Sequence, residues 1–230
     1  MENLSFRYHK KMPLVLDQVN FAIQSGEIVA LTGPNGSGKT TFIKHLNGLL
    51  TPTSGSLYLR GRKVEKPREL VKEVGVVFQN PNDQVFFPVV EDDIAFGPRN
   101  LSLPDEEVWD RVTRALEDMG ISHLRKRSFA KLSFGEKKKV SLAGVLASDP
   151  QVMVLDEPTI GVDAWSKPAF VSLIRSLRDD NPNRTILLAT HDYDLLQIVD
   201  RTYLLWDGRV RGIYDTVDDF IKEAMAFPVT

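Results

Sequence analysis

The chain has 230 residues, 42% of them hydrophobic, which is enough for one α/β domain with a sizeable core. Its 29 basic and 31 acidic residues leave a net charge of −2, so no overall positive field favours nucleic acid, and we expect no nucleic-acid partner. The lack of cysteine excludes disulfides and a thiolate nucleophile, and no apolar run approaches the roughly 18 residues of a membrane-spanning helix.

The first third of the chain alternates short apolar runs with turns. Leu4 and Phe6 alternate with polar residues in the first run, which is the pattern of a half-buried strand, and we expect the first two strands to pair antiparallel. Strands are predicted at 2–8, 14–21, 28–31, 56–59 and 74–78, and a helix at 42–50.

A glycine-rich segment with the pattern G-x-x-x-x-G-K-[ST] lies between the strand at 28–31 and the helix at 42–50. Its glycines let successive backbone N–H groups point into one concavity, and the helix adds the positive end of its dipole. Lys39 can then neutralise the β- and γ-phosphates of a nucleotide, and the Thr40 hydroxyl can face Mg²⁺. A plain turn would not need these two side chains. The predicted phosphate-binding loop consists of Gly33, Pro34, Asn35, Gly36, Ser37, Gly38, Lys39, Thr40 and Thr41.

Proline turns and amphipathic segments follow from residue 80 to about 132. The clearest helix is predicted at 106–119, where apolar residues recur at helical spacing and are assigned to core packing. Beyond it, apolar runs alternate with helical segments, which is typical of an α/β fold with a parallel sheet. Strands are predicted at 152–155, 185–189, 203–206 and 209–214, the last two as a hairpin, and helices at 170–177 and 218–225.

Two carboxylates, Asp156 and Glu157, directly follow the apolar strand at 152–155. A parallel sheet places both at its carboxyl edge, where the phosphate loop also lies. Asp156 is suited to hold Mg²⁺ through water, and Glu157 to polarise a water for attack on the γ-phosphate. Strands also commonly end in solvated acids, but a phosphate loop upstream favours the catalytic interpretation.

The segment Leu-Ser-Phe-Gly-Glu at 132–136 precedes another predicted helix. Ser133 and Glu136 match the S-x-x-E capping box, so the segment could serve only to start that helix. A capped, glycine-containing helix N-terminus is also an anion site, and the three lysines at 137–139 add positive charge. Both interpretations can hold together.

These motifs occur in the order found in ATP-binding cassette (ABC) ATPases, and the match covers nearly the whole chain. It comprises the phosphate loop, Gln79 after its strand, the 132–136 segment, the acidic pair, the loop at 158–163 and His191 after an apolar strand. The resemblance implies an α/β fold. Its P-loop NTPase core has a mostly parallel sheet, with an N-terminal antiparallel β subdomain and an inserted α-helical subdomain. The core of this single domain, 1–230, would comprise 1–79 and 145–230, and the helical subdomain 80–144.

The resemblance also implies roles for single residues around ATP and Mg²⁺. Tyr8 would stack on adenine, Gln79 would contact magnesium and the attacking water, and His191 would contact the γ-phosphate. Tyr8 could instead be an ordinary edge-strand aromatic, Gln79 a solvated strand end and His191 a core histidine. The remaining histidines, His9, His45 and His123, are assigned to structure.

The resemblance further implies that two subunits sandwich two ATP molecules head to tail. Ser133 and Gly135 would bind the γ-phosphate of the nucleotide held by the partner subunit, and Asp163 would lie at the same interface. The sequence departs from the family pattern at Phe134 and Glu136, where glycine and glutamine are usual. Because the serine and the second glycine remain, we expect binding across the interface to survive.

The segment 78–98 more narrowly resembles the ATPase subunits of energy-coupling-factor importers, which take up cobalt, nickel or vitamins. This implies a peripheral ATPase at the cytoplasmic face of the cell membrane. A transmembrane coupling protein would dock near 80–98, where the apolar run 85–87 beside the acidic run 91–93 suits an amphipathic basic helix. A substrate-binding membrane subunit would act indirectly. The alternative is a buried helix with a solvated acidic end.

Other functions are also compatible with the sequence. A soluble ABC ATPase of the cluster-assembly type, or the ATPase of another ABC transporter class, would carry the same motifs. Chromosome and repair ATPases would need a long coiled coil between loop and signature, and no heptad run exists here. The cargo is not determined, and both a homodimer and a heterodimer with a related ATPase are compatible with a complete motif set.

Overall fold

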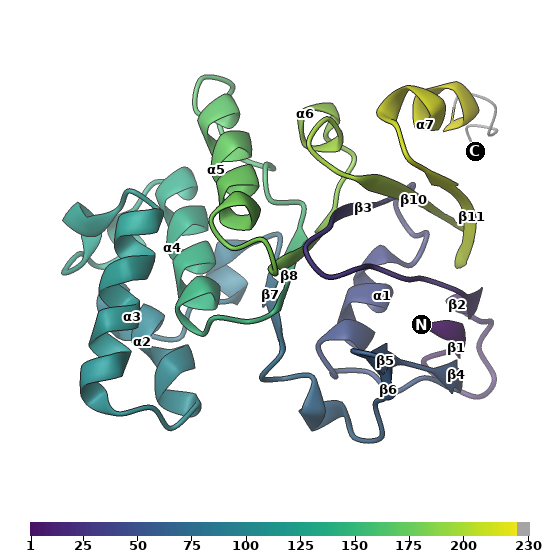
Figure 1. The fold of residues 1–230 in the computed structure, drawn as a ribbon, viewed down its shortest axis with the longest axis horizontal. Coiled ribbons are helices and arrows are strands. Elements are labelled where there is room, and N and C mark those ends of the chain that lie inside the picture. Colours follow the sequence, from purple (N-terminus) through teal and green to yellow (C-terminus); the bar gives the residue numbers. More distant parts are fainter. Residues whose placement is uncertain (225–230) are drawn as a thin grey trace.

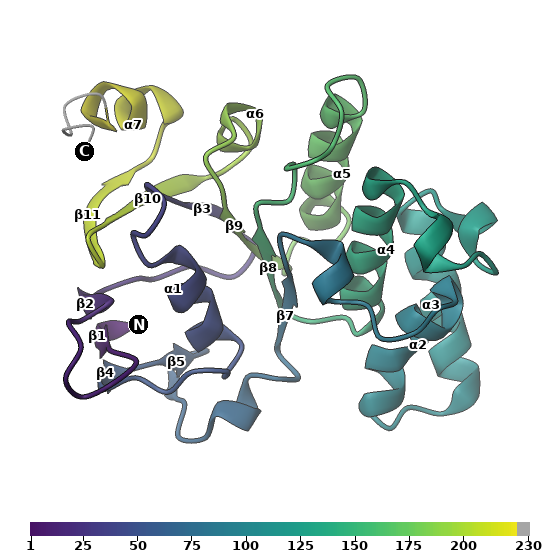
Figure 2. The ribbon, with the colours of Figure 1, turned by 180° about the vertical axis from the view of Figure 1, so that it is seen from behind.

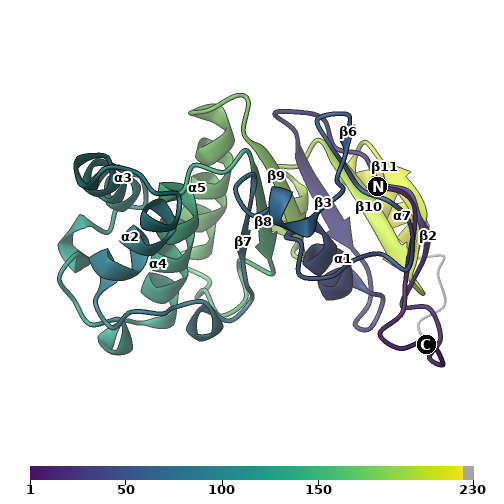
Figure 3. The same ribbon diagram turned by 90° about the horizontal axis from the view of Figure 1, so that it is seen from below.

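The computed structural model of the protein describes residues 1–224, and a six-stranded sheet runs through its middle (Figure 1, Figure 3). The strand order is β11-β10-β3-β9-β8-β7, and neighbours are parallel except β10 and β11. The predicted α/β fold with a mostly parallel sheet is therefore confirmed. The strands are β3 (Ile28–Thr32), β7 (Val74–Val77), β8 (Val152–Asp156), β9 (Thr185–Ala189), β10 (Arg201–Trp206) and β11 (Arg209–Tyr214).

Helices cover both faces of this sheet, because parallel strands bury both of their faces. Side chains alternate along β3, so Val29 packs with Phe42 of α1 (Lys39–Leu46). Ile28 belongs to a second core with Ile174 of α5 (Lys167–Asp179). Figure 2 shows α1 and α5 on opposite sides of the sheet.

A small antiparallel sheet in the order β2-β1-β4 packs near the N-terminus. Its strands β1 (Glu2–Phe6) and β2 (Leu16–Val19) confirm the predicted antiparallel pair. The single strand predicted at 56–59 is wrong, because Leu57 turns into the core and divides it. β4 (Ser54–Ser56) pairs with β1, whereas β5 (Tyr58–Leu59) pairs with β6 (Arg62–Lys63).

Three helices, α2 (Val90–Asn100), α3 (Asp105–Asp118) and α4 (Phe134–Ala147), pack together at one end of the molecule, beyond β7 (Figure 1). The predicted helix at 106–119 is confirmed as α3. The alternative interpretation of 80–98 as a buried helix is confirmed for α2, although its acidic residue Glu91 is buried and not solvated. Gly97 and Pro98 disfavour a helix interior. Packing reverses this preference: a Cβ at Gly97 would come to 2.0 Å from Ser148 Oγ, so glycine lets α2 lie close to the end of α4.

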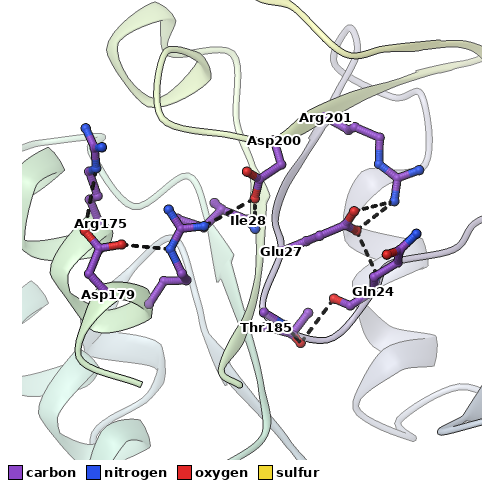
Figure 4. A network of polar contacts seen from close by, with 10 residues as sticks. Gln24, Glu27, Ile28, Arg175, Asp179, Thr185, Asp200 and Arg201 are labelled. Carbon is purple, nitrogen blue, oxygen red and sulfur yellow. Dashed lines mark hydrogen bonds and ion pairs between the residues drawn. The ribbon is translucent and has the colours of Figure 1, made fainter. Parts of the chain in front are cut away.

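Polar contacts hold the start of β3, at the end of the sheet remote from the carboxyl edge (Figure 4). Glu27 accepts two hydrogen bonds from Arg201 Nη2, at 2.8 and 2.7 Å. Asp200 accepts one from the Ile28 backbone N–H at 2.7 Å. These contacts pin the parallel register of β3 and β10.

The C-terminal part confirms the predicted hairpin, with Trp206 opposite Arg209. Its first strand, β10, also joins the main sheet beside β3, which was not predicted. Helix α7 (Val217–Ala224) begins near the predicted position, and Met225, the last residue of the predicted helix, lies outside the described residues. No helix in residues 1–224 is long and apolar enough to cross a bilayer. Shorter elements are α6 (Tyr193–Leu196) and 3₁₀ turns at Pro67–Glu69, Pro81–Asp83, Ser122–Leu124 and Phe129–Lys131.

Candidate functional site

The phosphate loop lies between β3 and α1, at the carboxyl edge of the sheet. Helix α1 begins at Lys39, three residues earlier than predicted, and ends at Leu46 instead of residue 50. Gly33 directly follows β3, and a Cβ there would come to 2.0 Å from the Leu205 carbonyl oxygen of β10. Only glycine fits at this position, because the loop closes onto the neighbouring strand.

The side chain of Lys39 folds back over its own loop. Its Nζ donates hydrogen bonds to the carbonyl oxygens of Gly33 at 2.6 Å and Pro34 at 3.1 Å. Burial lowers the pKa of Lys39, and the nearby carboxylates of Glu157 and Asp156 oppose this shift. The loop lysine and the acidic pair therefore share one electrostatic environment.

Tyr8 lies beside the loop. Its Oη shares a hydrogen bond of 3.0 Å with Thr41 Oγ1, and its ring packs edge-on against Phe6 at 5.0 Å. The Tyr8 ring remains accessible to solvent, since the residue is 54% exposed. An exposed aromatic face next to a phosphate loop can accept a stacked base.

The acidic pair ends β8, and both residues are buried. Burial raises the pKa of Asp156, the adjacent Glu157 raises it further, and Lys39 and Lys138 partly offset the shift. Only β9 separates β8 from β3 in the sheet. The structure therefore brings the acidic pair and the phosphate loop together, as the strand pattern predicts.

Glu157 adopts an unusual backbone conformation, with φ of +45°. Such a conformation costs about 1–3 kcal/mol for a residue other than glycine and persists where the surroundings hold it. The Glu157 N–H donates to the Ala189 carbonyl at 2.8 Å. Its carboxylate accepts from His191 Nδ1 at 2.8 Å and from Thr190 Oγ1 at 3.3 Å. Residues at the end of β9 thus aim the carboxylate, while the His191 side chain stays 70% exposed.

A cavity of about 430 Å³ opens between these elements. Among the residues predicted to bind nucleotide within one chain, Gly33, Pro34, Ser37 and Tyr8 do not line it. Gly33 and Pro34 instead accept hydrogen bonds from Lys39, and Ser37 is buried beneath the loop. The lining residues are Val15, Asn35, Gly36, Gly38, Lys39, Thr40, Thr41, Gln79, Asp156, Glu157, Ile160 and His191.

Ser133, Gly135 and Asp163 lie outside this cavity. Ser133 caps α4: its Oγ accepts from the Glu136 N–H at 3.3 Å, and Glu136 accepts from the Ser133 N–H at 2.7 Å, so the predicted capping box is confirmed. Asp163 Oδ1 accepts from the Ser166 N–H at 3.0 Å, before α5. Within a single chain, Ser133 and Asp163 serve local turns and helix starts and are exposed.

The chemistry of the cavity suits a magnesium nucleotide. Thr40, Gln79 and Asp156 offer a hydroxyl, an amide and a carboxylate, the oxygen ligands that Mg²⁺ prefers, and all three line the cavity. A Cβ at Gly36 would meet no atom within 4 Å, so the backbone there is open to a phosphate.

Several residues of the site were missed by the sequence analysis. Val15 and Ile160 line the cavity, and Thr190 binds Glu157. The three lysines at 137–139 were all expected to add positive charge behind the anion site at the helix N-terminus. Lys138, however, is 1% exposed and its Nζ donates to the Glu157 carbonyl oxygen at 2.9 Å. Its position four residues before the buried Leu142, on the core face of α4, is the signal that would have revealed it.

A strand, phosphate loop and helix, with an acidic pair from a nearby parallel strand at the same cavity, define the class of P-loop nucleoside triphosphatases (NTPases). Residues 16–160 match the family model described as ABC transporter. The chain belongs to this family, and it is an ATPase that couples ATP hydrolysis to transport.

Curated relatives narrow this assignment. The energy-coupling factor transporter ATP-binding protein EcfA of Methanocaldococcus jannaschii is 42% identical, over 99% of this chain and 84% of its own length. EcfA of Methanoculleus marisnigri is 47% identical, over 86% of this chain and 72% of its own length. The predicted resemblance to ABC ATPases and, more narrowly, to energy-coupling-factor ATPases is therefore confirmed.

Solved structures agree with the curated relatives. The structure of cbiO1 from Clostridium perfringens, described as part of the ABC transporter complex cbiONQ, matches with a TM-score of 0.87 at 34% identity, covering 97% of this chain and 90% of its own. The ATP-binding cassette MJ0796, in a dimeric structure bound to ADP and Pi, matches with a TM-score of 0.81 at 25% identity, covering 93% and 97%.

Proposed function

We propose that this chain is the ATPase subunit that energises an energy-coupling-factor importer. The proposal is supported by one cavity that the phosphate loop, the acidic pair and the strand-end residues line together, in a chain 42–47% identical to proteins named EcfA. The cargo we propose is a transition metal ion such as cobalt or nickel, or a vitamin, and the chain would work at the cytoplasmic face of the membrane. ATP closes a dimer, hydrolysis reopens it, and the motion passes to a transmembrane subunit.

The proposed chemistry is phosphoryl transfer to water, which depends on positioning and charge neutralisation. When nucleotide binds, the Lys39 ammonium would give up its hydrogen bonds to the two loop carbonyls and contact the β- and γ-phosphates instead. Thr40, Gln79 and Asp156 would hold Mg²⁺, which when bound supplies positive charge at those phosphates. Glu157, already held by hydrogen bonds, would align and polarise the attacking water.

Two further residues complete the proposed nucleotide site. His191 binds Glu157 through Nδ1, so its exposed ring can present Nε2 to the γ-phosphate. The exposed ring of Tyr8 would stack on adenine.

We propose that a second copy, or a related ATPase, supplies the remaining contacts. Ser133, Gly135 and Asp163 lie outside the cavity of their own chain, so a partner subunit would be needed to bring them to a nucleotide. The dimeric structure of the relative MJ0796 supports this arrangement. We also propose that each chain divides into a core, residues 1–79 and 145–230, and a helical subdomain, residues 80–144.

We propose that the transmembrane coupling protein docks on a groove at α2. The groove, of about 280 Å³, lies between α2, α4 and the start of β7, and its aromatic lining includes Phe86 and Phe96, whose rings lie 5.0 Å apart. Phe86 is 71% exposed and Phe87 is 37% exposed, and both rings pack against Phe96, so they form a contiguous apolar patch of the kind that marks interaction sites. An amphipathic helix can bury such a patch.

The expected attraction between the acidic run 91–93 and a basic helix needs correction. Glu91 is buried and already paired with Arg125 at 2.7 Å and with Lys126. Asp93 Oδ1 accepts from the backbone N–H of Phe86 at 2.8 Å, and burial raises the pKa of Asp93. Glu91 is thus neutralised and Asp93 holds the loop that presents Phe86. The partly exposed Asp92 is the residue of this run that a basic helix could contact, beside the apolar contact with Phe86.

The test is copurification from native cells with the membrane proteins identified by mass spectrometry. We expect the wild-type chain to recover a transmembrane coupling protein and a small substrate-binding membrane subunit. Phe86→Glu should lower this recovery tenfold or more, because burying a phenylalanine contributes about 1.5–3 kcal/mol. Ile213→Glu, at a 53% exposed position on β11, is the matched control and should recover both proteins. Recovery of no membrane protein by the wild type would refute the importer assignment.

A further inference from the structure

Lys138 is a buried lysine that none of the proposed roles uses. It lies in the second turn of α4, five residues after Ser133, and is 1% exposed. Lysine is almost never fully buried unless it is paired, because its charge loses hydration. Its Nζ donates to the backbone carbonyl oxygen of Glu157 at 2.9 Å. The lysine therefore contacts the main chain of the proposed catalytic residue, whereas His191 and Thr190 hold its carboxylate.

This contact falls on the residue whose backbone most needs support. Glu157 has φ of +45°, and a residue other than glycine keeps such a conformation only where its surroundings fix it. The Glu157 N–H donates to the Ala189 carbonyl at 2.8 Å, and the Glu157 carbonyl oxygen accepts from Lys138 Nζ at 2.9 Å. The direction in which the carboxylate leaves the backbone depends on both contacts.

The charges around Lys138 explain why a lysine can lie there. Asp156 and Glu157, both at the end of β8, face it and favour its protonated form, and Lys39 on α1 faces the same two carboxylates. Burial outweighs the two carboxylates and lowers the pKa of Lys138 to about 8. Two lysines from two helices thus balance two adjacent carboxylates.

A second contact joins the same helix to the segment after Glu157. Phe134, at the first position of α4, lies against Gly161, where an added Cβ would come to 2.4 Å from its ring. Lys138 Nζ in turn lies 5.7 Å from the centre of the Phe134 ring. Phe134, one of the two departures from the usual signature, therefore fills the space between α4 and the loop 158–163.

We propose that Lys138 is a positioning residue for ATP hydrolysis, which holds the main chain of Glu157 and so ties the catalytic carboxylate to the helix that begins at the signature segment. The inference rests on the proposed role of Glu157. A shift of α4 at Ser133 would move Lys138 and Phe134 with it, and through them the segment 157–161. The attacking water would then be aligned only when α4 is correctly placed.

The test compares Lys138→Met with Lys139→Met in the chain purified with its membrane partners. Methionine has a similar length but no donor, and Lys139 is partly exposed on the same helix. We expect Lys138→Met to lower kcat tenfold or more, since small misplacements of a catalytic group cost about 100-fold. The KM for ATP should stay within threefold, and Lys139→Met should match the wild type. Unchanged kcat in Lys138→Met would overturn the proposal.

Two further measurements separate positioning from a loss of structure. Lys138→Gln retains an N–H donor and should recover part of the lost kcat. In a Glu157→Gln background, single-turnover hydrolysis should be no slower with Lys138→Met than without it, because the lysine acts through Glu157. An equal further loss in that background would overturn the inference. If Glu157→Gln alone keeps wild-type turnover, the proposed catalytic role of Glu157 fails instead.

If Lys138→Met does not fold, Lys138→Gln carries the test through the same kcat and KM comparison. If Lys138→Gln lowers kcat by the same factor in the Glu157→Gln background as in the wild type, the lysine does not act through Glu157 and the proposal is overturned.

Discussion

Replacing Glu157 with glutamine keeps the shape of the side chain and removes its negative charge. Both carboxylate oxygens are engaged in the structure, Oε1 by His191 and Oε2 by Thr190, so the amide oxygen can accept from only one of these donors. The variant therefore keeps its approximate position but cannot take a proton. General bases contribute about 10²–10⁴-fold, so we expect kcat to fall by that factor, which corresponds to about 3–5 kcal/mol in activation free energy.

Nucleotide binding should survive in Glu157→Gln, because the phosphate loop is untouched. Glu157 also helps to raise the pKa of Asp156, so the substitution should move that pKa downward and keep the proposed magnesium ligand ionised. An ATP-bound dimer should therefore accumulate. Phosphate release measures the turnover, and light scattering with Mg·ATP, against Mg·ADP as the control, measures the dimer.

Two results would contradict this reasoning. Turnover within threefold of the wild type would refute the assignment of Glu157 as the residue that polarises water. Loss of turnover together with loss of nucleotide binding would show that the carboxylate acts on binding as well as on hydrolysis.

Two predictions concern stability. Arg201→Met should lower the free energy of unfolding by about 1.5–3 kcal/mol in urea denaturation, because it leaves the largely buried Glu27 without two charge-assisted hydrogen bonds; an equal loss in Arg62→Met, on the exposed strand β6, would contradict this. Burial lowers the pKa of Lys138 from 10.5 to about 8, so between these values the unfolded chain binds more protons, and the stability of the wild type relative to Lys138→Met should rise with pH. A difference that stays constant from pH 7.5 to 10 would contradict a lowered pKa of Lys138 in the folded chain.

The phosphate loop and the acidic pair could be predicted from the sequence alone, because each is defined by residues that are close together in the chain. The spacing of glycines, lysine and threonine at 33–41 follows from what a strand-to-helix turn must do to cradle phosphate. Apolar runs such as 28–31 indicate buried parallel strands, whose carboxyl ends share one edge. The convergence of Asp156 with Lys39 followed from that rule, and the structure shows it.

The remaining features depend on contacts between segments far apart in the chain, so only the tertiary structure decided them. Helix α2 forms despite Gly97 and Pro98, because glycine lets it approach α4 closely. The first strand of the C-terminal hairpin takes its place beside β3, and Gly33 then packs against it. Lys138 belongs to a run of three lysines that reads as solvated charge, and only the packing of α4 on the end of β8 buries it against Glu157. Local spacing thus determined which groups are present, whereas the packing of distant elements determined which of them touch.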